Sequence, residues 1–221
     1  MLAVTVHFLG EIGVIRGIVL AAGASTRMGQ AKAALPFGQT GETVVARVVR
    51  TLLLGGVPDV TVVAGAHIDA VRMAMPSHEP RARVIEHPNW RQGQLSSLLA
   101  GLDAIDDPLL EAAVVTLVDV PLVLPSTVSA VIAEWRRTRA PIVRPSEGAS
   151  GESGASRAER HGHPVVFDRS VFEDLRAADP NAGAKAVFAK HRDRVMNVEV
   201  KDAGAFEDID TPEDYERVLG A

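Results

Sequence analysis

The chain has 221 residues, of which 47% are hydrophobic, so it is long enough to bury a full core in one large domain. It contains no cysteine, which excludes disulfides, zinc–thiolate sites, iron–sulfur clusters and thiol nucleophiles. The net charge of −5 argues against a broad nucleic-acid-binding face. Nucleic acid is therefore not an expected partner. No apolar run reaches the length of a transmembrane helix, so a membrane is not an expected partner either. A cytoplasmic location is expected.

Residues 1–13 are apolar and lack the basic start of a signal peptide. An unstructured extension, an added edge strand and a misassigned start codon all remain open for this segment. We therefore expect an N-terminal extension over residues 1–13, followed by a single domain over residues 14–221.

Short apolar runs then alternate with amphipathic patterns along the rest of the chain. Strands are expected, in chain order, over residues 14–21, 60–64, 83–86, 113–118, 141–144, 164–167 and 195–200. Helices are expected over residues 42–54, 68–75, 95–105, 126–137, 170–178, 184–191 and from 212 onward. Ser126 is expected to cap one helix and Thr211 another, and the Gly- and Ser-rich segment 146–160 has the composition of a flexible loop.

Buried strands that are separated by helices predict an α/β fold. We expect three layers, with a mostly parallel sheet and helices on both of its faces, in a Rossmann-like arrangement. Ligands of such sheets bind beyond the carboxyl ends of the strands. The segments that follow the strands are therefore the places to look for function.

The most informative of these segments follows the first strand, over residues 18–38. Gly23 and small neighbours open a turn whose backbone N–H groups are able to cradle phosphate oxygens. Arg27 adds a planar fork of donors, and Lys32 adds a point charge. Two cations beside a bare backbone suit a nucleoside triphosphate.

The spacing of this segment excludes two familiar phosphate-binding motifs. A P-loop has four residues between its glycines, whereas five residues separate Gly23 from Gly29. A dinucleotide fingerprint needs G-x-G-x-x-G, and Ser25 stands where its second glycine is required.

The segment resembles the signature L-A-A-G-x-S-x-R-M-G-x-x-K of nucleotidyltransferases that activate small phosphates. The residues that match it are Leu20, Ala21, Ala22, Gly23, Ser25, Arg27, Met28, Gly29 and Lys32. This resemblance implies that these residues bind the nucleotide. It also implies that Arg27 and Lys32 act in catalysis.

Asp119 directly follows the apolar run Val-Val-Thr-Leu-Val, at the exit of a buried strand. A carboxylate there costs desolvation unless it is paired or binds a metal ion. Its place at the same sheet edge as Lys32 favours a catalytic Mg²⁺ ligand, and a turn or helix cap is the alternative. In the resembled family, the motif D-x-D/N-T-P supplies a second ligand of the metal ion. This chain carries the motif as Asp208-Ile209-Asp210-Thr211-Pro212. The resemblance thus assigns Asp210 to Mg²⁺ and Asp208 to a structural role, although helix capping also explains Asp210.

Two further segments complete the set. Residues 89–98 precede an amphipathic helix, and the family places this segment, including Gly93, Ser96 and Ser97, against the base and ribose of the nucleotide. Trp90 suits either stacking on a ring or packing in the core. The run Gly162-His163-Pro164 resembles the family's acceptor-binding segment. No G-x-S-x-G motif is present, so a serine hydrolase lacks its signature.

Together these segments resemble the molybdenum cofactor cytidylyltransferase branch of the superfamily, from about residue 14 to the C-terminus. The resemblance implies a nucleotide-diphospho-sugar transferase-like fold, a Mg²⁺ cofactor and transfer of CMP from CTP to a phosphorylated acceptor such as molybdopterin. It also implies a molybdoenzyme or its chaperone as a partner. Two departures bear on the acceptor: Val120 stands where these enzymes often carry glutamine, and residues 180–185 lack the G-D-x-G-A-R pattern.

Three alternatives remain at this level. Guanylyltransferase relatives usually have a second glycine at the position of Ala22, so Ala22 favours CTP over GTP. A non-catalytic nucleotide sensor has no need to keep Lys32, Asp119 and Asp210 together. A nicotinamide-dependent oxidoreductase needs the dinucleotide fingerprint that the chain lacks. An assay of pyrophosphate release separates a transferase from the other two classes.

Overall fold

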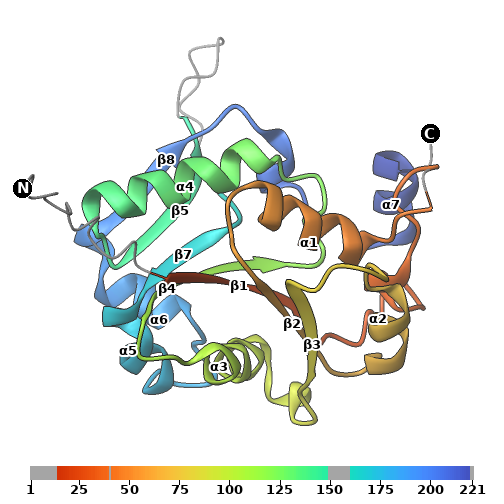
Figure 1. Cartoon of the computed structure of the whole chain (residues 1–221), viewed down its shortest axis with the longest axis horizontal. Helices are drawn as coiled ribbons and strands as arrows, with labels where there is room; N and C mark the ends of the chain where they lie inside the picture. The colour runs from red at the N-terminus through yellow and green to blue at the C-terminus, as the bar shows by residue number, and fades with distance from the viewer. Residues whose placement is uncertain (1–13, 40, 149–159, 220–221) are drawn as a thin grey trace, which may run out of the picture.

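The computed structural model describes residues 14–39, 41–148 and 160–219 (Figure 1). In that part of the chain one sheet has the strand order β3-β2-β1-β4-β7-β5-β6, with β8 paired to β5. The strands are β1 (Val14–Ala21), β2 (Val60–Ala64), β3 (Ala82–Glu86), β4 (Leu110–Leu117), β5 (Ile142–Glu147), β6 (Arg160–His161), β7 (Val165–Asp168) and β8 (Val195–Glu199). Four pairs of neighbouring strands are parallel, and β7 runs antiparallel to β4 and β5. The predicted mostly parallel sheet is confirmed.

Helices cover both faces of this sheet (Figure 1). They are α1 (Val44–Leu54), α2 (Ile68–Ala74), α3 (Gln94–Ile105), α4 (Pro125–Thr138), α5 (Phe172–Arg176), α6 (Lys185–Lys190) and α7 (Pro212–Leu219). One hydrophobic core joins the sheet to α1 and α4, with Val45 and Trp135 fully buried. A second core joins the opposite face to α3 and α5, with Leu102 and Leu175 fully buried. Two separate cores produce the predicted three layers.

The boundaries predicted from the sequence agree closely with these elements except at β6. The flexible loop expected over residues 146–160 is wrong at both ends, because Ser146 and Glu147 belong to β5 and Arg160 begins β6, which pairs with β5. One predicted cap is also wrong. Helix α4 begins at Pro125, and its N-cap residue is Leu124 rather than the predicted Ser126. The cap function is supplied from far along the chain, because Asp202 accepts hydrogen bonds from the Leu124 N–H and the Thr127 hydroxyl. Proline at the first helical position has no N–H group, which leaves one fewer donor to satisfy at this end of the helix.

The predictions for residues 1–13 and for residues 149–159 of the expected loop lie outside the described residues. The expectation of a single domain over residues 14–221 stays a prediction. No helix in the described part of the chain is both long enough and apolar enough to span a membrane.

The order of the strands creates a crevice beside β1. The chain passes from β1 outward through β2 to β3 and then returns to β4 on the other side of β1. The three inner strands end in register, because Ala21 pairs with Ala64 of β2 and Leu20 pairs with Leu117 of β4. The connections after these strands therefore leave the same edge and diverge, which is the usual ligand position in open α/β sheets.

Candidate active site

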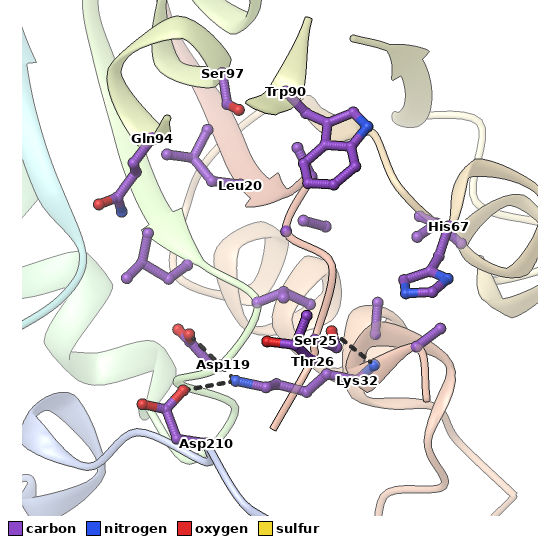
Figure 2. A pocket seen from close by; sticks show the side chains of 18 of the residues that line it. Leu20, Ser25, Thr26, Lys32, His67, Trp90, Gln94, Ser97, Asp119 and Asp210 are labelled. Carbon is purple, nitrogen blue, oxygen red and sulfur yellow. Dashed lines mark hydrogen bonds and ion pairs between the residues drawn. The ribbon is translucent and has the colours of Figure 1, made fainter. Parts of the chain in front are cut away.

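A cleft of about 500 Å³ opens at the carboxyl ends of β1, β2 and β4 (Figure 2). Its walls come from the segments that follow these three strands, together with the start of α3 and one residue before α7. The predicted site residues that line it are Leu20, Ala21, Ala22, Gly23, Ser25, Arg27, Lys32, Gly93, Ser97, Asp119 and Asp210. Residues from five separate parts of the sequence thus meet in one place.

The first wall is the phosphate loop, which we define as residues 22–31. Ser25 adopts the left-handed conformation, with φ of 48°. Its carbonyl oxygen accepts hydrogen bonds from the N–H groups of Met28 and Gly29, at 3.0 and 3.1 Å. Its hydroxyl oxygen accepts a hydrogen bond from the Lys32 N–H at 3.3 Å, where a single 3₁₀ turn (η1, Lys32–Ala34) begins. Ser25 therefore fixes the shape of the loop through both its backbone and its side chain.

Lys32 lies at the end of this loop and is only 8% exposed. Its Nζ atom is 2.9 Å from Asp210 Oδ1 and 3.5 Å from Asp119 Oδ2. The Arg27 Nη2 atom lies 2.9 Å from the other oxygen of Asp210. A buried ammonium needs such partners, because an unpaired charge in this position costs several kcal/mol, on the order of 3–5. The four predicted polar residues therefore form one connected ionic group.

The carboxylate of Asp210 is not a helix cap. Helix α7 is capped by Thr211, whose hydroxyl oxygen accepts a hydrogen bond from the Asp214 N–H at 3.2 Å. The hydrogen bond from Lys32, assisted by the charge of Arg27, instead holds the pKa of Asp210 below its usual range. The alternative explanation of Asp210 from the sequence is thereby answered, because its side chain points into the cleft (Figure 2).

The two carboxylates have the chemistry of a divalent-cation site. Asp119 Oδ1 is buried, and no hydrogen-bond donor reaches it from the described residues. A carboxylate oxygen without a partner fits a hard cation such as Mg²⁺, which prefers one or two carboxylates together with substrate phosphates. No cluster of three or more His, Cys, Asp or Glu side chains suited to a metal occurs in the described part of the chain. The remaining ligands of a cation here would be phosphate and water oxygens.

Asp208 stands beside this pair but does not line the cleft. Desolvation, followed by the negative charges of Asp119 and Asp210, raises the pKa of its carboxyl group above the usual range. Its position fits the structural role that the sequence resemblance gave it.

Three residues of the predicted nucleotide site lie outside the cleft wall. Met28 is 6% exposed and packs in the core between the sheet and α1, so its side chain anchors the phosphate loop to that core. Gly29 closes the turn in a left-handed conformation, with φ of 71°. Ser96 donates its hydroxyl to the Gly93 carbonyl and contacts His87 at 3.0 Å, so it shapes the approach to α3.

None of the residues of the predicted acceptor segment Gly162-His163-Pro164 lines the cleft, and their role in binding an acceptor stays a prediction. The His163 N–H donates to the Ala205 carbonyl at 2.9 Å, and Gly162 lies so close to that carbonyl that a Cβ atom would come within 2.0 Å of it. Burial lowers the pKa of His163, and the negative charge of Asp119 opposes this shift in part. Pro164 is buried against the α1–α4 layer. The segment packs the C-terminal chain against the sheet.

The structure adds cleft residues that the sequence did not single out. His67, three residues after the end of β2, lies on the wall opposite the carboxylates (Figure 2). Trp90, for which the sequence left stacking on a ring and packing in the core open, lines the far end of the cleft, and Arg91 lies over its ring at 4.4 Å from the centroid. The other additional lining residues with polar side chains are Thr26 and Gln94. A search of every segment that follows a parallel strand would have found His67.

Fold, cleft and paired charges together define a nucleotide-binding enzyme of the α/β class with a candidate divalent-cation site. The family described as MobA-like NTP transferase domain matches residues 17–195, and the chain belongs to this family. It is a nucleotidyltransferase, with the nucleotide-diphospho-sugar transferase fold that the sequence resemblance implied.

Similar proteins carry different names. Nicotine blue oxidoreductase of Paenarthrobacter nicotinovorans is 31% identical over 211 residues, which cover 95% of this chain and 98% of that protein. A probable molybdenum cofactor guanylyltransferase of Mycolicibacterium paratuberculosis is 32% identical over 136 residues, which cover 62% of this chain and 65% of that protein.

Solved structures agree with the fold. The crystal structure of Rv0371c from Mycobacterium tuberculosis H37Rv has a TM-score of 0.76 and 27% identity, covering 95% of this chain and 99% of that one. The same protein has also been solved in complex with manganese, with a TM-score of 0.70, 26% identity and coverage of 94% and 99%.

The pKa of Asp210 provides a direct test of the ionic group. Because Lys32 is the main cause of its lowered pKa, we expect Lys32→Met to raise this pKa toward the ordinary value of 3.8. In the native protein the stabilisation from the Asp210 contacts is present above pH 3.8 and is lost as the pH falls through the lower folded-state pKa. Carbon-detected NMR titration of the aspartate carboxyl groups measures the shift.

A matched control is Lys190→Met, since Lys190 lowers the pKa of Asp174 on the surface. This control should move the titration of Asp174 and leave that of Asp210 unchanged. An unchanged titration of Asp210 in Lys32→Met would show that the contact between Lys32 and Asp210 does not cause the lowered pKa of Asp210.

Proposed function

We propose that the protein is a Mg²⁺-dependent cytidylyltransferase that transfers CMP from CTP to a phosphorylated small molecule such as molybdopterin and releases pyrophosphate. The observation that carries the proposal is the contact of Lys32 with both Asp119 and Asp210 beside the phosphate loop. One cation and two carboxylates at this position match the needs of a triphosphate with its metal ion. The likeness of part of the chain to a protein named a molybdenum cofactor guanylyltransferase supports the acceptor class.

In the proposed reaction, an oxygen of the acceptor phosphate attacks the α-phosphorus of CTP. A new phosphorus–oxygen bond forms, the bond between the α-phosphorus and the bridging oxygen breaks, and pyrophosphate leaves with the electron pair. Lys32 and Arg27 stabilise the charge that accumulates on the leaving pyrophosphate. The N–H groups of the phosphate loop orient the phosphates, so positioning and electrostatics supply the catalysis without a covalent enzyme intermediate.

Asp119 and Asp210 would hold the Mg²⁺ ion. When bound, such an ion would neutralise part of the phosphate charge as a Lewis acid. Asp119 leaves the end of β4, and Asp210 is held by the Ile209 N–H, which donates to the Asp119 carbonyl at 2.8 Å. The two carboxylates are therefore fixed relative to each other by the backbone.

The preference for CTP over GTP rests on Ala22. This residue is 5% exposed and lines the cleft between β1 and the phosphate loop. Its methyl group takes space that a glycine would leave to a larger purine. Guanylyltransferase remains the alternative within this fold, and a molybdoenzyme or its chaperone is a further proposed partner that would receive the product.

One relative is named an oxidoreductase, so the nicotinamide-dependent oxidoreductase considered above is the second candidate. The loop after β1 lacks the glycines that a dinucleotide pyrophosphate requires, and its cations suit a triphosphate better. Consumption of NADH or NADPH without pyrophosphate release would favour this candidate. Pyrophosphate release without consumption of either cofactor would exclude it.

The experiment that tests the proposal is a screen of CTP, GTP, ATP and UTP against molybdopterin and other phosphorylated acceptors, with Mg²⁺ or Mn²⁺, that reads pyrophosphate release. We expect release with a higher kcat/KM for CTP than for GTP, because Ala22 narrows the base site. A higher kcat/KM for GTP would overturn the nucleotide assignment. Nucleotide binding without release on any acceptor would support a non-catalytic sensor.

A second prediction concerns Lys32. We expect Lys32→Ala to lower kcat by a factor of about 100, or roughly 3 kcal/mol of transition-state stabilisation, since its ammonium neutralises the leaving group. Steady-state kinetics measures the loss, and circular dichroism checks that the fold is kept. The control is Lys190→Ala, which removes an exposed lysine from an ion pair outside the cleft. Turnover within a few-fold of the wild type would remove Lys32 from the reaction.

A third prediction concerns the metal. We expect Asp119→Asn and Asp210→Ala to abolish the Mg²⁺ dependence of CTP binding, because each removes one of two protein ligands. Calorimetric titration of CTP with and without Mg²⁺ measures this. Thr211→Ala is the matched control, since it removes the α7 cap and should cost about 1 kcal/mol of stability while leaving the metal response intact. An Asp210→Ala protein that keeps Mg²⁺-dependent turnover would show that Asp119 works alone.

A further inference from the structure

The connection between β2 and α2, residues 65–67, packs directly against the phosphate loop. The Ala66 N–H donates to the Ala22 carbonyl at 3.1 Å. The His67 Nε2 atom lies 2.9 Å from the Ala24 carbonyl oxygen. Gly65 permits this approach, because a Cβ atom there would come within 2.7 Å of the Ala22 carbonyl oxygen. The carbonyls of Ala22 and Ala24 are thus both held by the one turn at residues 65–67.

These contacts set the direction of the loop's N–H groups. A carbonyl oxygen only accepts, so the His67 Nε2 atom carries a proton and donates it to Ala24. In a trans peptide the C=O and N–H bonds point in opposite directions. The N–H groups of Gly23 and Ser25 therefore point away from the turn that binds the carbonyls of Ala22 and Ala24. Neither N–H has a hydrogen-bond acceptor within the described residues.

The backbone of Ser25 shows why this orientation needs support. A left-handed conformation, with φ of 48°, is unfavourable for a residue with a Cβ atom and persists where its surroundings fix it. On the C-terminal side, the bonds from Met28 and Gly29 to the Ser25 carbonyl fix it. On the N-terminal side, the only polar side chain that contacts the preceding peptide in the described residues is that of His67.

We propose that His67 is a positioning residue, which holds the peptide between Ala24 and Ser25 so that the Ser25 N–H faces a phosphate of the bound nucleotide. The inference rests on the proposed function, because it assigns a phosphate to that N–H. His67 acts through the loop backbone and takes no part in the chemical step.

The test compares His67→Ala, His67→Gln and wild-type protein. Glutamine places an amide N–H where the Nε2–H stood, so it should restore the contact that alanine removes. With Mg²⁺ present, we expect calorimetry to show about ten-fold weaker binding of CTP and of inorganic tripolyphosphate to His67→Ala, which is the usual worth of one hydrogen bond. Binding to His67→Gln should return to within about three-fold of the wild type.

The controls separate positioning from a general loss of structure. His78→Ala removes an exposed histidine from the loop after α2 and should change neither binding nor the unfolding midpoint. Tripolyphosphate affinity of His67→Ala within two-fold of the wild type would overturn the inference, as would equal losses in His67→Ala and His67→Gln. A wild-type protein that binds both ligands but transfers no nucleotide would overturn the proposed function while the binding series still decides on His67. A wild-type protein that binds neither would overturn both.

Discussion

The ion pairs of Lys32 with Asp119 and Asp210 are the contact on which the rest of the site depends. Lys32 is nearly buried, and its ammonium would be strongly destabilising without both carboxylates. The three residues come from the loop after β1, the end of β4 and the segment before α7, so the ion pairs form only once the sheet and the C-terminal chain are in place. The site is thus a product of the whole fold.

The return of the C-terminal chain to the strand ends has its own supports. The Ile209 N–H donates to the Asp119 carbonyl, and the Ala205 carbonyl accepts from the His163 N–H. Asp202 caps α4 by accepting a hydrogen bond from the Leu124 N–H, 78 residues earlier in the chain. These contacts explain why residues 162–164 are closely packed against the C-terminal chain.

Much of this was predictable from the sequence, because local rules govern the elements concerned. The apolar runs fixed the strands β1 and β2 to the residue, and Thr211 before Pro212 marked the start of α7. The cap of α4 was not predictable, since Asp202 is distant in sequence and no local pattern connects it to Leu124. The place of Met28 in the core was missed for a related reason. A motif shows which residues recur together, but the side that each side chain faces is set by the turn at Ser25.

The charges of the cleft explain why a cation belongs to the site. Lys32 and Arg27 are already balanced by Asp119 and Asp210, so these four residues leave no net charge to attract a triphosphate. A bound nucleotide with about four negative charges would face two carboxylates at close range, which is costly at low dielectric. A divalent cation held by the two carboxylates would offset that repulsion and would leave Lys32 and Arg27 to interact with the phosphates. Under the proposed function, the ion pairs that stabilise the site without ligand would also make nucleotide binding dependent on a metal ion.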